Sequence, residues 1–280
     1  MKEIKATDEC RHELGYKLMR PIVSWNFKRK YHPVVIGGEN IPKSGPLVFC
    51  GNHRHKDDQY NVMLETKRVI HMLSKDEYFK GKSAWFYRAA GCIPVDRSIH
   101  DENAKSEARA ILHSKGCIGL FPEGTRNEVT CKDEELEKLE KILNISKEEI
   151  IEKIKYKSIR TTQVNLLIDL KKQNKITKDE LKEFVLDADN ALLKLLKKKI
   201  ITKEEYNESL LLPFKFGAVS LAKKENALII PFATTGLYNG EKDQLITRIG
   251  KPLDISGMEL EDANKLLRET MIKLMQKSEE

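Results

Sequence analysis

Residues 128–212 constrain the fold of this chain more than any other feature. The segment contains no glycine and no proline and is dense in Lys, Glu, Leu and Ile. One phrase recurs in it three times, as ISKEEI, ITKDEL and ITKEEY. Each copy contains S/T-x-x-E, in which a Ser or Thr N-cap and a Glu three residues later satisfy free backbone N–H groups at a helix start. The segment is therefore predicted to be all helical, with N-caps at Ser146, Thr177 and Thr202, although three irregularly spaced copies are too few for a solenoid.

The sequence on either side of this helical segment alternates short apolar runs with Gly and Pro. Five runs are predicted to be strands. Four are expected to be buried, namely VVIGG, PLVFCGNH, CIGLFPEG and ALIIPFATTG, and LITRIGKPL is a further strand. The stretches between them are predicted to contain helices, and VIHML could be a further strand. The pattern predicts an α/β fold, a mixed central sheet flanked by helices. Because both flanks share this texture, residues 31–127 and 213–280 are expected to form one domain that 128–212 interrupts as an insertion.

The N-terminal residues 1–30 form a separate segment, in which 11–31 mix apolar, aromatic and basic side chains. Such a segment could lie in a bilayer interface, or it could be a helix whose apolar face packs on its own domain. No run of about 18 apolar residues exists, so no transmembrane helix is expected. The first residues also lack the apolar core of a signal peptide, which favours the cytosol or a cytosol-facing surface.

The overall charge and the cysteines limit the classes of partner and site. The formal net charge of +7 suits an anionic partner, such as a membrane surface, a phosphorylated substrate or nucleic acid, without choosing among them. The five cysteines are widely spaced and include no C-x-x-C pair. A disulfide framework and a thiolate zinc site are therefore disfavoured.

The heptad NHRHKDD, residues 52–58, admits two chemical interpretations. As H-x-H-x-D it offers His53, His55 and Asp57 as metal ligands and resembles part of the metallo-β-lactamase H-x-H-x-D-H motif. That motif requires a histidine where this chain has Asp58. Further ligands would have to come from histidines in settings unlike those of ligands: His71, His100 and His113. The metal interpretation is therefore the weaker one.

The second interpretation pairs His53 as a general base with Asp58 as its orienting carboxylate. A spacing of five residues is about 140° around a helix, so the segment must turn to bring the two side chains together. Two later phrases, GCIPVDRS and LFPEGTRN, place Arg97 and Arg126 in turns after apolar runs. Two such arginines could bind a phosphate, although each turn alone could be an ordinary surface turn.

The four blocks NHRHKDD, GCIPVDR, FPEGTRN and LIIPFATTG, in this order, resemble the glycerolipid acyltransferase family, whose type members are 1-acylglycerol-3-phosphate acyltransferases. The resemblance covers roughly residues 30–127 and 213–252. It implies that His53 is the general base and Asp58 its partner. The chain departs from the family at His55, Lys56 and Asp57, so Asp57 competes with Asp58 for this role, although the register favours Asp58. It also implies that a second group of residues binds the glycerol phosphate of the acceptor: Arg97, Glu123, Gly124 and Arg126.

The resemblance further implies transfer of a fatty acyl group from acyl-CoA or acyl carrier protein to lysophosphatidate, giving phosphatidate. No metal and no bound cofactor are expected, and no nucleic acid partner. A peripheral position on the cytoplasmic face of an anionic membrane is expected. The alternatives are another lysophospholipid or amphiphile as acceptor, a zinc metallohydrolase, or a non-catalytic lipid-binding protein. The insertion could be a lid, a membrane arm, a carrier-docking surface, or a tolerated surface insertion without a catalytic role.

Overall fold

The computed structural model describes residues 13–96, 98–99, 101–155 and 157–276. Its centre is a seven-stranded sheet in the order β1-β7-β6-β2-β5-β3-β4. The strands are β1 (Val34–Ile36), β2 (Leu47–Gly51), β3 (Ile70–Lys75), β4 (Ile93–Val95), β5 (Cys117–Leu120), β6 (Leu228–Gly236) and β7 (Leu245–Ile249). All neighbouring pairs are parallel except β6 and β7. The predicted mixed α/β sheet is therefore confirmed.

The strand predictions hold with one correction. The VIHML stretch lies in β3, as one of the two interpretations allowed. The prediction that VVIGG is a buried strand is wrong, because β1 lies at the edge of the sheet and pairs only with β7. Its residue Ile36 is 50% exposed. An apolar run alone does not distinguish a central strand from an edge strand.

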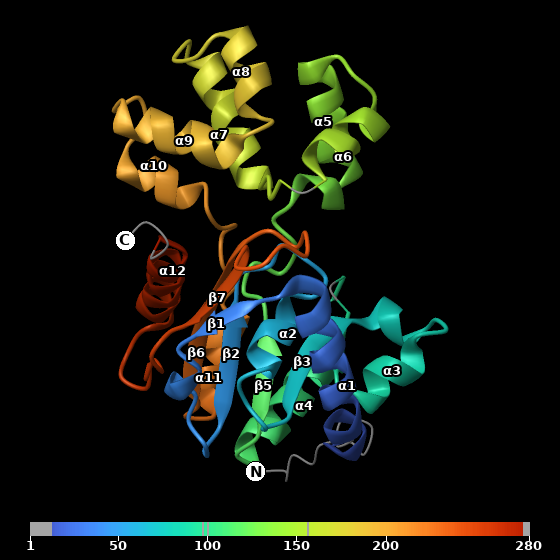
Figure 1. Ribbon diagram of the computed structural model, residues 1–280. Helices are drawn as coiled ribbons and strands as arrows, with labels where there is room; N and C mark the ends of the chain where they lie inside the picture. The colour runs from blue at the N-terminus through green and yellow to red at the C-terminus, as the bar shows by residue number, and fades with distance from the viewer. Residues whose placement is uncertain (1–12, 97, 100, 156, 277–280) are drawn as a thin grey trace.

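Helices cover both faces of the sheet (Figure 1). On one face, Leu47 and Phe49 pack in a cluster with residues of α1 (Glu13–Tyr31) and α2 (Asp58–Met63). The alternating residues Val48 and Cys50 point to the other face. That face packs against α4 (Glu102–His113), α11 (Gly217–Lys224) and α12 (Leu260–Gln276), while the short α3 (Ala84–Ala89) contacts α1.

The described residues between β5 and α11 form a short 3-10 helix, η4 (Val129–Cys131), and six α-helices, which lie beyond one end of the sheet in Figure 1. They are α5 (Asp133–Leu143), α6 (Lys147–Ile154), α7 (Thr161–Lys172), α8 (Lys178–Phe184), α9 (Ala188–Lys197) and α10 (Lys203–Glu208). Thr177 and Thr202 form complete capping boxes with Glu180 and Glu205, as predicted. The Ser146 hydroxyl accepts the N–H of Glu149.

These six helices form three consecutive helix–turn–helix hairpins. Each hairpin turns at a residue in the left-handed region: Asn144 at φ 58°, Asn174 at φ 57° and Lys199 at φ 58°. After the turn of the second hairpin, Lys175 N–H donates to Leu170 C=O at 2.9 Å, and the third hairpin repeats this bond at the same distance. Each recurring sequence phrase therefore marks the start of the second helix in one hairpin.

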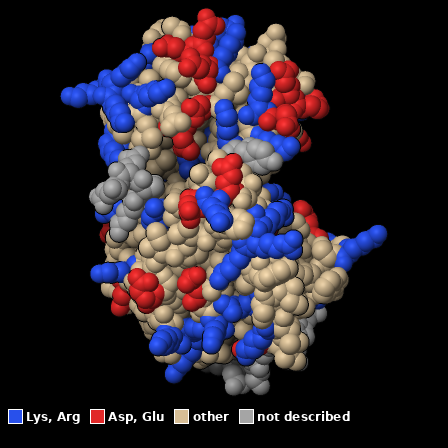
Figure 2. Space-filling model, viewed as in Figure 1, with Lys and Arg blue, Asp and Glu red and all other residues tan. Residues whose placement is uncertain are grey.

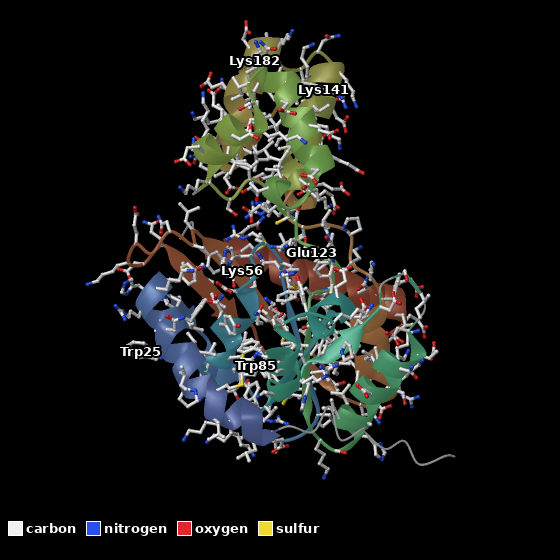
Figure 3. The ribbon with its side chains drawn as sticks, turned by 90° about the vertical axis from the view of Figure 1, so that its right-hand side faces the viewer. Trp25, Lys56, Trp85, Glu123, Lys141 and Lys182 are labelled. Atoms are coloured by element: carbon white, nitrogen blue, oxygen red, sulfur yellow. The ribbon has the colours of Figure 1, made fainter. Side chains whose placement is uncertain are left out.

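Helix α1 has apolar residues on two sides. Tyr16, Phe27 and Tyr31 are buried against the domain, as the second interpretation of this segment predicted. The other side exposes four large side chains at helical spacing, between 62% and 71% exposed: Leu14, Leu18, Ile22 and Trp25. Figure 3 shows Trp25 on the outer side of this helix. Within the part of the chain that the structure describes, no helix is both long and apolar enough to cross a bilayer.

Candidate active site

The motif residues follow the carboxyl ends of parallel strands, where ligands gather in α/β sheets. The heptad follows β2, FPEGTRN follows β5, the Asp96 turn follows β4, and Tyr238 follows β6. Strand β2 lies between β6 and β5 and is parallel to both, so the carboxyl ends of the three strands lie at the same end of the sheet. Lys56 and Glu123 mark this end of the sheet in Figure 3, directly beneath the helical insertion.

His53 and Asp58 lie next to each other at this end of the sheet. Asp58 is the first residue of α2, and the chain turns between β2 and α2 to bring the two side chains together. The distance from His53 Nδ1 to Asp58 Oδ2 is 3.0 Å. The imidazole is 15% exposed and the carboxylate only 1%. The ring of Phe121 stacks on the imidazole with centroids 4.0 Å apart. Phe121 therefore covers one face of the imidazole, which remains partly exposed.

The carboxylate of Asp58 accepts four hydrogen bonds. Besides His53, Oδ2 accepts the backbone N–H groups of Arg54 and His55, each at 2.7 Å, and Oδ1 accepts the Tyr238 hydroxyl at 2.6 Å. Burial by itself raises the pKa of Asp58, but the hydrogen bonds from His53, Tyr238 and the His55 N–H more than offset it. The pKa of Asp58 therefore lies below its usual range, and the carboxylate is charged beside His53.

Asp57 and His55 have other partners. Asp57 Oδ2 accepts the Tyr31 hydroxyl at 3.1 Å. The His55 ring stacks on Tyr238 at 4.0 Å, and burial lowers its pKa. His53 thus pairs with Asp58 and not with Asp57, which answers the question raised by the doubled aspartate.

The metal interpretation gains no support from the described residues, among which no three His, Cys, Asp or Glu side chains are grouped to hold an ion. His71 is buried in β3, with Nδ1 2.7 Å from Gly91 O, which fits a core residue. His113 lies at the end of α4 with its side chain 79% exposed. His100 lies outside the described residues.

Glu123 is 4% exposed, and both of its carboxylate oxygens accept backbone N–H groups. Oε1 accepts from His53 at 2.7 Å and Oε2 from Leu212 at 2.9 Å. Burial raises the pKa of Glu123 to about 7, against the lowering effect of these two bonds. The residue therefore supports the backbone of His53, while its predicted contact with the acceptor stays a prediction.

Gly124 and Arg126 lie in the turn that follows. Gly124 has φ +70°, a backbone conformation that favours glycine, and its nearest neighbour is the flexible side chain of Lys215. Arg126 is half-buried and makes no hydrogen bond or ion pair with the residues that the structure describes. Its guanidinium is therefore available to an anion. Arg97 lies outside the described residues, so the predicted pairing of the two arginines stays a prediction.

A cavity of about 210 Å³ begins at His53 and extends beneath α1. Near His53 it is lined by polar side chains, including Lys56, Thr125 and Arg126. The rest of the lining is mixed: Met19, Val23, Met63, Met72 and Phe86 are apolar, and Arg20, Gln59, Ser74 and Lys75 are polar or charged. The arrangement suits an amphiphile whose polar head lies beside the histidine.

Several residues of the site were not assigned a role from the sequence. Tyr238 donates the fourth hydrogen bond to the Asp58 carboxylate, although it lies 180 residues away in the chain. Asn52 is buried and exchanges two hydrogen bonds with the backbone of Thr234, at 2.9 and 2.7 Å, which ties the end of β2 to β6. Phe121 is the first residue of the FPEGTR motif, but nothing in the sequence indicated that its ring would stack on the His53 imidazole.

Comparison with known proteins agrees with this geometry. The family model described as Acyltransferase matches residues 32–235. No curated protein sequence matches the chain. The crystal structure of PlsC, the 1-acyl-sn-glycerophosphate (LPA) acyltransferase from Thermotoga maritima, has a similar fold, with a TM-score of 0.52 and 15% sequence identity. The similarity covers 93% of this chain and 81% of that chain. At this identity the structural likeness concerns the fold, whereas the family model spans well over half of the sequence. The chain therefore belongs to the Acyltransferase family and is an acyltransferase.

Proposed function

We propose that this acyltransferase moves a fatty acyl group from a thioester to the free hydroxyl of lysophosphatidate, giving phosphatidate. The observation that carries the proposal is the His53–Asp58 pair beside a cavity with both apolar and polar lining residues, Arg126 among them. The donor is acyl-CoA or an acyl carrier protein. No metal and no bound cofactor take part in the proposed reaction.

The chemistry follows from the orientation of the imidazole. Asp58 is charged and accepts from Nδ1, so Nδ1 carries a proton and Nε2 is the nitrogen that can accept one. Nε2 takes the proton of the acceptor hydroxyl as its oxygen attacks the thioester carbonyl. The new C–O bond forms, the C–S bond breaks, and the leaving thiolate takes the proton from the imidazolium. Asp58 stabilises the imidazolium between these steps.

The same cavity supports a phosphate-bearing amphiphile as acceptor. The guanidinium of Arg126 and the exposed ammonium of Lys56 both line this cavity together with His53. They would bind the phosphate monoester with charge-assisted hydrogen bonds, together with Arg97 as predicted from the family. The methionines and Phe86 of the lining would contact an acyl chain.

The exposed face of α1 supports docking of the α/β domain on an anionic membrane. This face presents Leu14, Leu18, Ile22 and Trp25, and Lys28 to Lys30 follow in the last turn. Trp85 on the neighbouring α3 is 67% exposed. Basic and acidic residues are equal in number in 128–212, so the net charge of +7 resides in the rest of the chain. In Figure 2, Lys and Arg gather on the α/β domain beneath the insertion, which carries both signs.

A transfer assay with purified protein tests the acceptor and the donor. Lysophosphatidate and lysophospholipids with larger head groups are offered with acyl-CoA and with acyl carrier protein thioester in turn. We expect the highest kcat/KM with lysophosphatidate and no transfer by His53→Ala. Preferred acylation of another lysolipid would overturn the proposed acceptor, and full activity of His53→Ala would overturn the proposed base.

Flotation with vesicles tests the membrane contact. Replacing Ile22 and Trp25 by Ser should abolish binding to vesicles that contain phosphatidylglycerol. The matched control is Ile151→Ser, which changes a 42% exposed apolar residue on the insertion and should leave binding unchanged. Equal binding by both variants would contradict docking through α1.

A further inference from the structure

The backbone of His53 is bound on both sides by the loop that leads into the insertion. Its N–H donates to Glu123 Oε1 at 2.7 Å, and its C=O accepts the N–H of Asn127 at 2.7 Å. Glu123 and Asn127 are 4% and 1% exposed, so water does not compete for these bonds. The position of the base therefore depends on where this loop lies.

The insertion binds the same two loop residues from its other side. Glu123 Oε2 accepts the N–H of Leu212, at the point where the chain leaves the insertion. The amide of Asn127 pairs with Thr162, the second residue of α7: Nδ2 donates to Oγ1 at 3.0 Å, and the Thr162 N–H donates to Oδ1 at 3.3 Å. Each link thus reaches from the insertion to His53 through one buried residue.

Thr162 also connects two parts of the insertion with each other. Its hydroxyl also donates to the C=O of Ser209, just after α10. One hydroxyl therefore joins the start of the second hairpin, the end of the third hairpin and the loop that binds His53. A displacement of α7 would be transmitted to Asn127 directly.

We propose that the insertion positions the general base, with Thr162 as the positioning residue that acts on His53 through Asn127. This inference rests on the proposed role of His53. A surface insertion without a catalytic role would need no hydrogen bonds to the two buried residues that bind the His53 backbone. The effect should be large, because a misplacement of about 1 Å can cost roughly 100-fold in rate.

The neighbouring residue supplies a matched control. Thr161 is of the same residue type, lies in the same helical turn and is 3% exposed. Its Oγ1 has no hydrogen-bond partner among the residues that the structure describes. Thr161→Val therefore removes a hydroxyl that bonds nothing, whereas Thr162→Val removes one that links three segments. Thr162→Ser keeps the hydroxyl and serves as the conservative rescue.

The experiment measures kcat, KM for both substrates, and Tm for Thr162→Val, Thr162→Ser and Thr161→Val, with kinetics recorded well below each Tm. We expect Thr162→Val to lower kcat roughly tenfold with both KM values within about twofold of wild type. Thr162→Ser should recover most of kcat, and Thr161→Val should match wild type. Thr162→Ala removes the same hydroxyl and replaces the valine variant if that does not fold.

Three results would overturn the inference. They are a wild-type kcat in Thr162→Val, an equal loss in Thr161→Val, and a failure of serine to restore kcat. His53→Ala separates this inference from the proposed function. If His53→Ala is inactive while Thr162→Val is unaffected, only the positioning role falls. If His53→Ala is fully active, the role of His53 as base falls, and the positioning role falls with it.

Discussion

The active site of the α/β domain and the helix starts of the insertion depend on contacts of opposite range. In the domain, Asp58 is bonded by Tyr238 from 180 residues away, and Asn52 by Thr234 from 182 residues away. In the insertion, Thr177 and Thr202 bond Glu180 and Glu205 three residues on, and each hairpin closes on a local turn. The difference suggests that the active site depends on the assembled sheet, whereas the helix starts and turns of the hairpins depend mainly on local sequence.

The largest expected effect tests the long-range side of this comparison. Asp58→Asn should lower kcat by about 10³- to 10⁴-fold, because the amide no longer stabilises the imidazolium or fixes its tautomer. Asp57→Asn should cost less than about tenfold, since an amide oxygen can still accept the Tyr31 hydroxyl. Steady-state kinetics on both variants, with circular dichroism to confirm folding, decide the matter. The reverse order of effects would make Asp57 the partner of the base.

Glu123 lies where the two regions meet, so its replacement should affect both activity and stability. In Glu123→Gln the amide nitrogen cannot accept an N–H, and one of the bonds to His53 and Leu212 is lost. We expect kcat to fall roughly tenfold. Steady-state kinetics across a range of pH measure this effect. Wild-type kcat in Glu123→Gln at every pH would show that the His53 N–H needs no charged acceptor.

The pH dependence of stability gives a second measurement on Glu123. Its pKa is raised to about 7 in the folded protein, so the folded state binds more protons than the unfolded state between the ordinary Glu value and pH 7. Its contribution is therefore fully present below the unfolded pKa and is lost as the pH rises through about 7. Denaturant unfolding should show wild type losing stability relative to Glu123→Gln across this window. A parallel pH dependence of the two proteins would contradict the raised pKa.

The sequence predicted these two regions to different depths, for reasons that the contacts explain. The helix starts at Thr177 and Thr202 were predictable because a capping box lies within four residues. The His53–Asp58 pair was predictable because the family motif carries it, although the doubled aspartate left the partner open. The stacking of Phe121, the hydroxyl of Tyr238 and the link from Thr162 to Asn127 were not, since they depend on how distant segments pack.

A smaller effect is expected from the outer partner of Asp58. Tyr238→Phe removes a buried hydroxyl that donates to Asp58 at 2.6 Å and accepts from Asn61 at 3.1 Å. The loss should cost about 1–3 kcal/mol of unfolding free energy and only a few-fold in kcat, because His53 and two backbone N–H groups still bond the carboxylate. Urea unfolding and kinetics measure the two effects. A loss of activity as large as that of Asp58→Asn would make Tyr238 part of the chemistry.

The smallest effect tests the local side of the comparison, through equivalent turns in two hairpins. Lys199 and Asn174 are both exposed and both in the left-handed region, at φ 58° and 57°. Lysine adopts this conformation at a cost of about 1 kcal/mol, whereas asparagine tolerates it. Lys199→Gly should therefore raise the unfolding free energy by about 0.5–1 kcal/mol, or roughly 1–3 °C in Tm, with kcat unchanged. Asn174→Gly is the matched control and should give little or no gain. Equal gains in unfolding free energy at the two turns would mean that lysine is no more strained there than asparagine. A change in kcat would show that the third hairpin is coupled to the active site beyond the contact at Thr162.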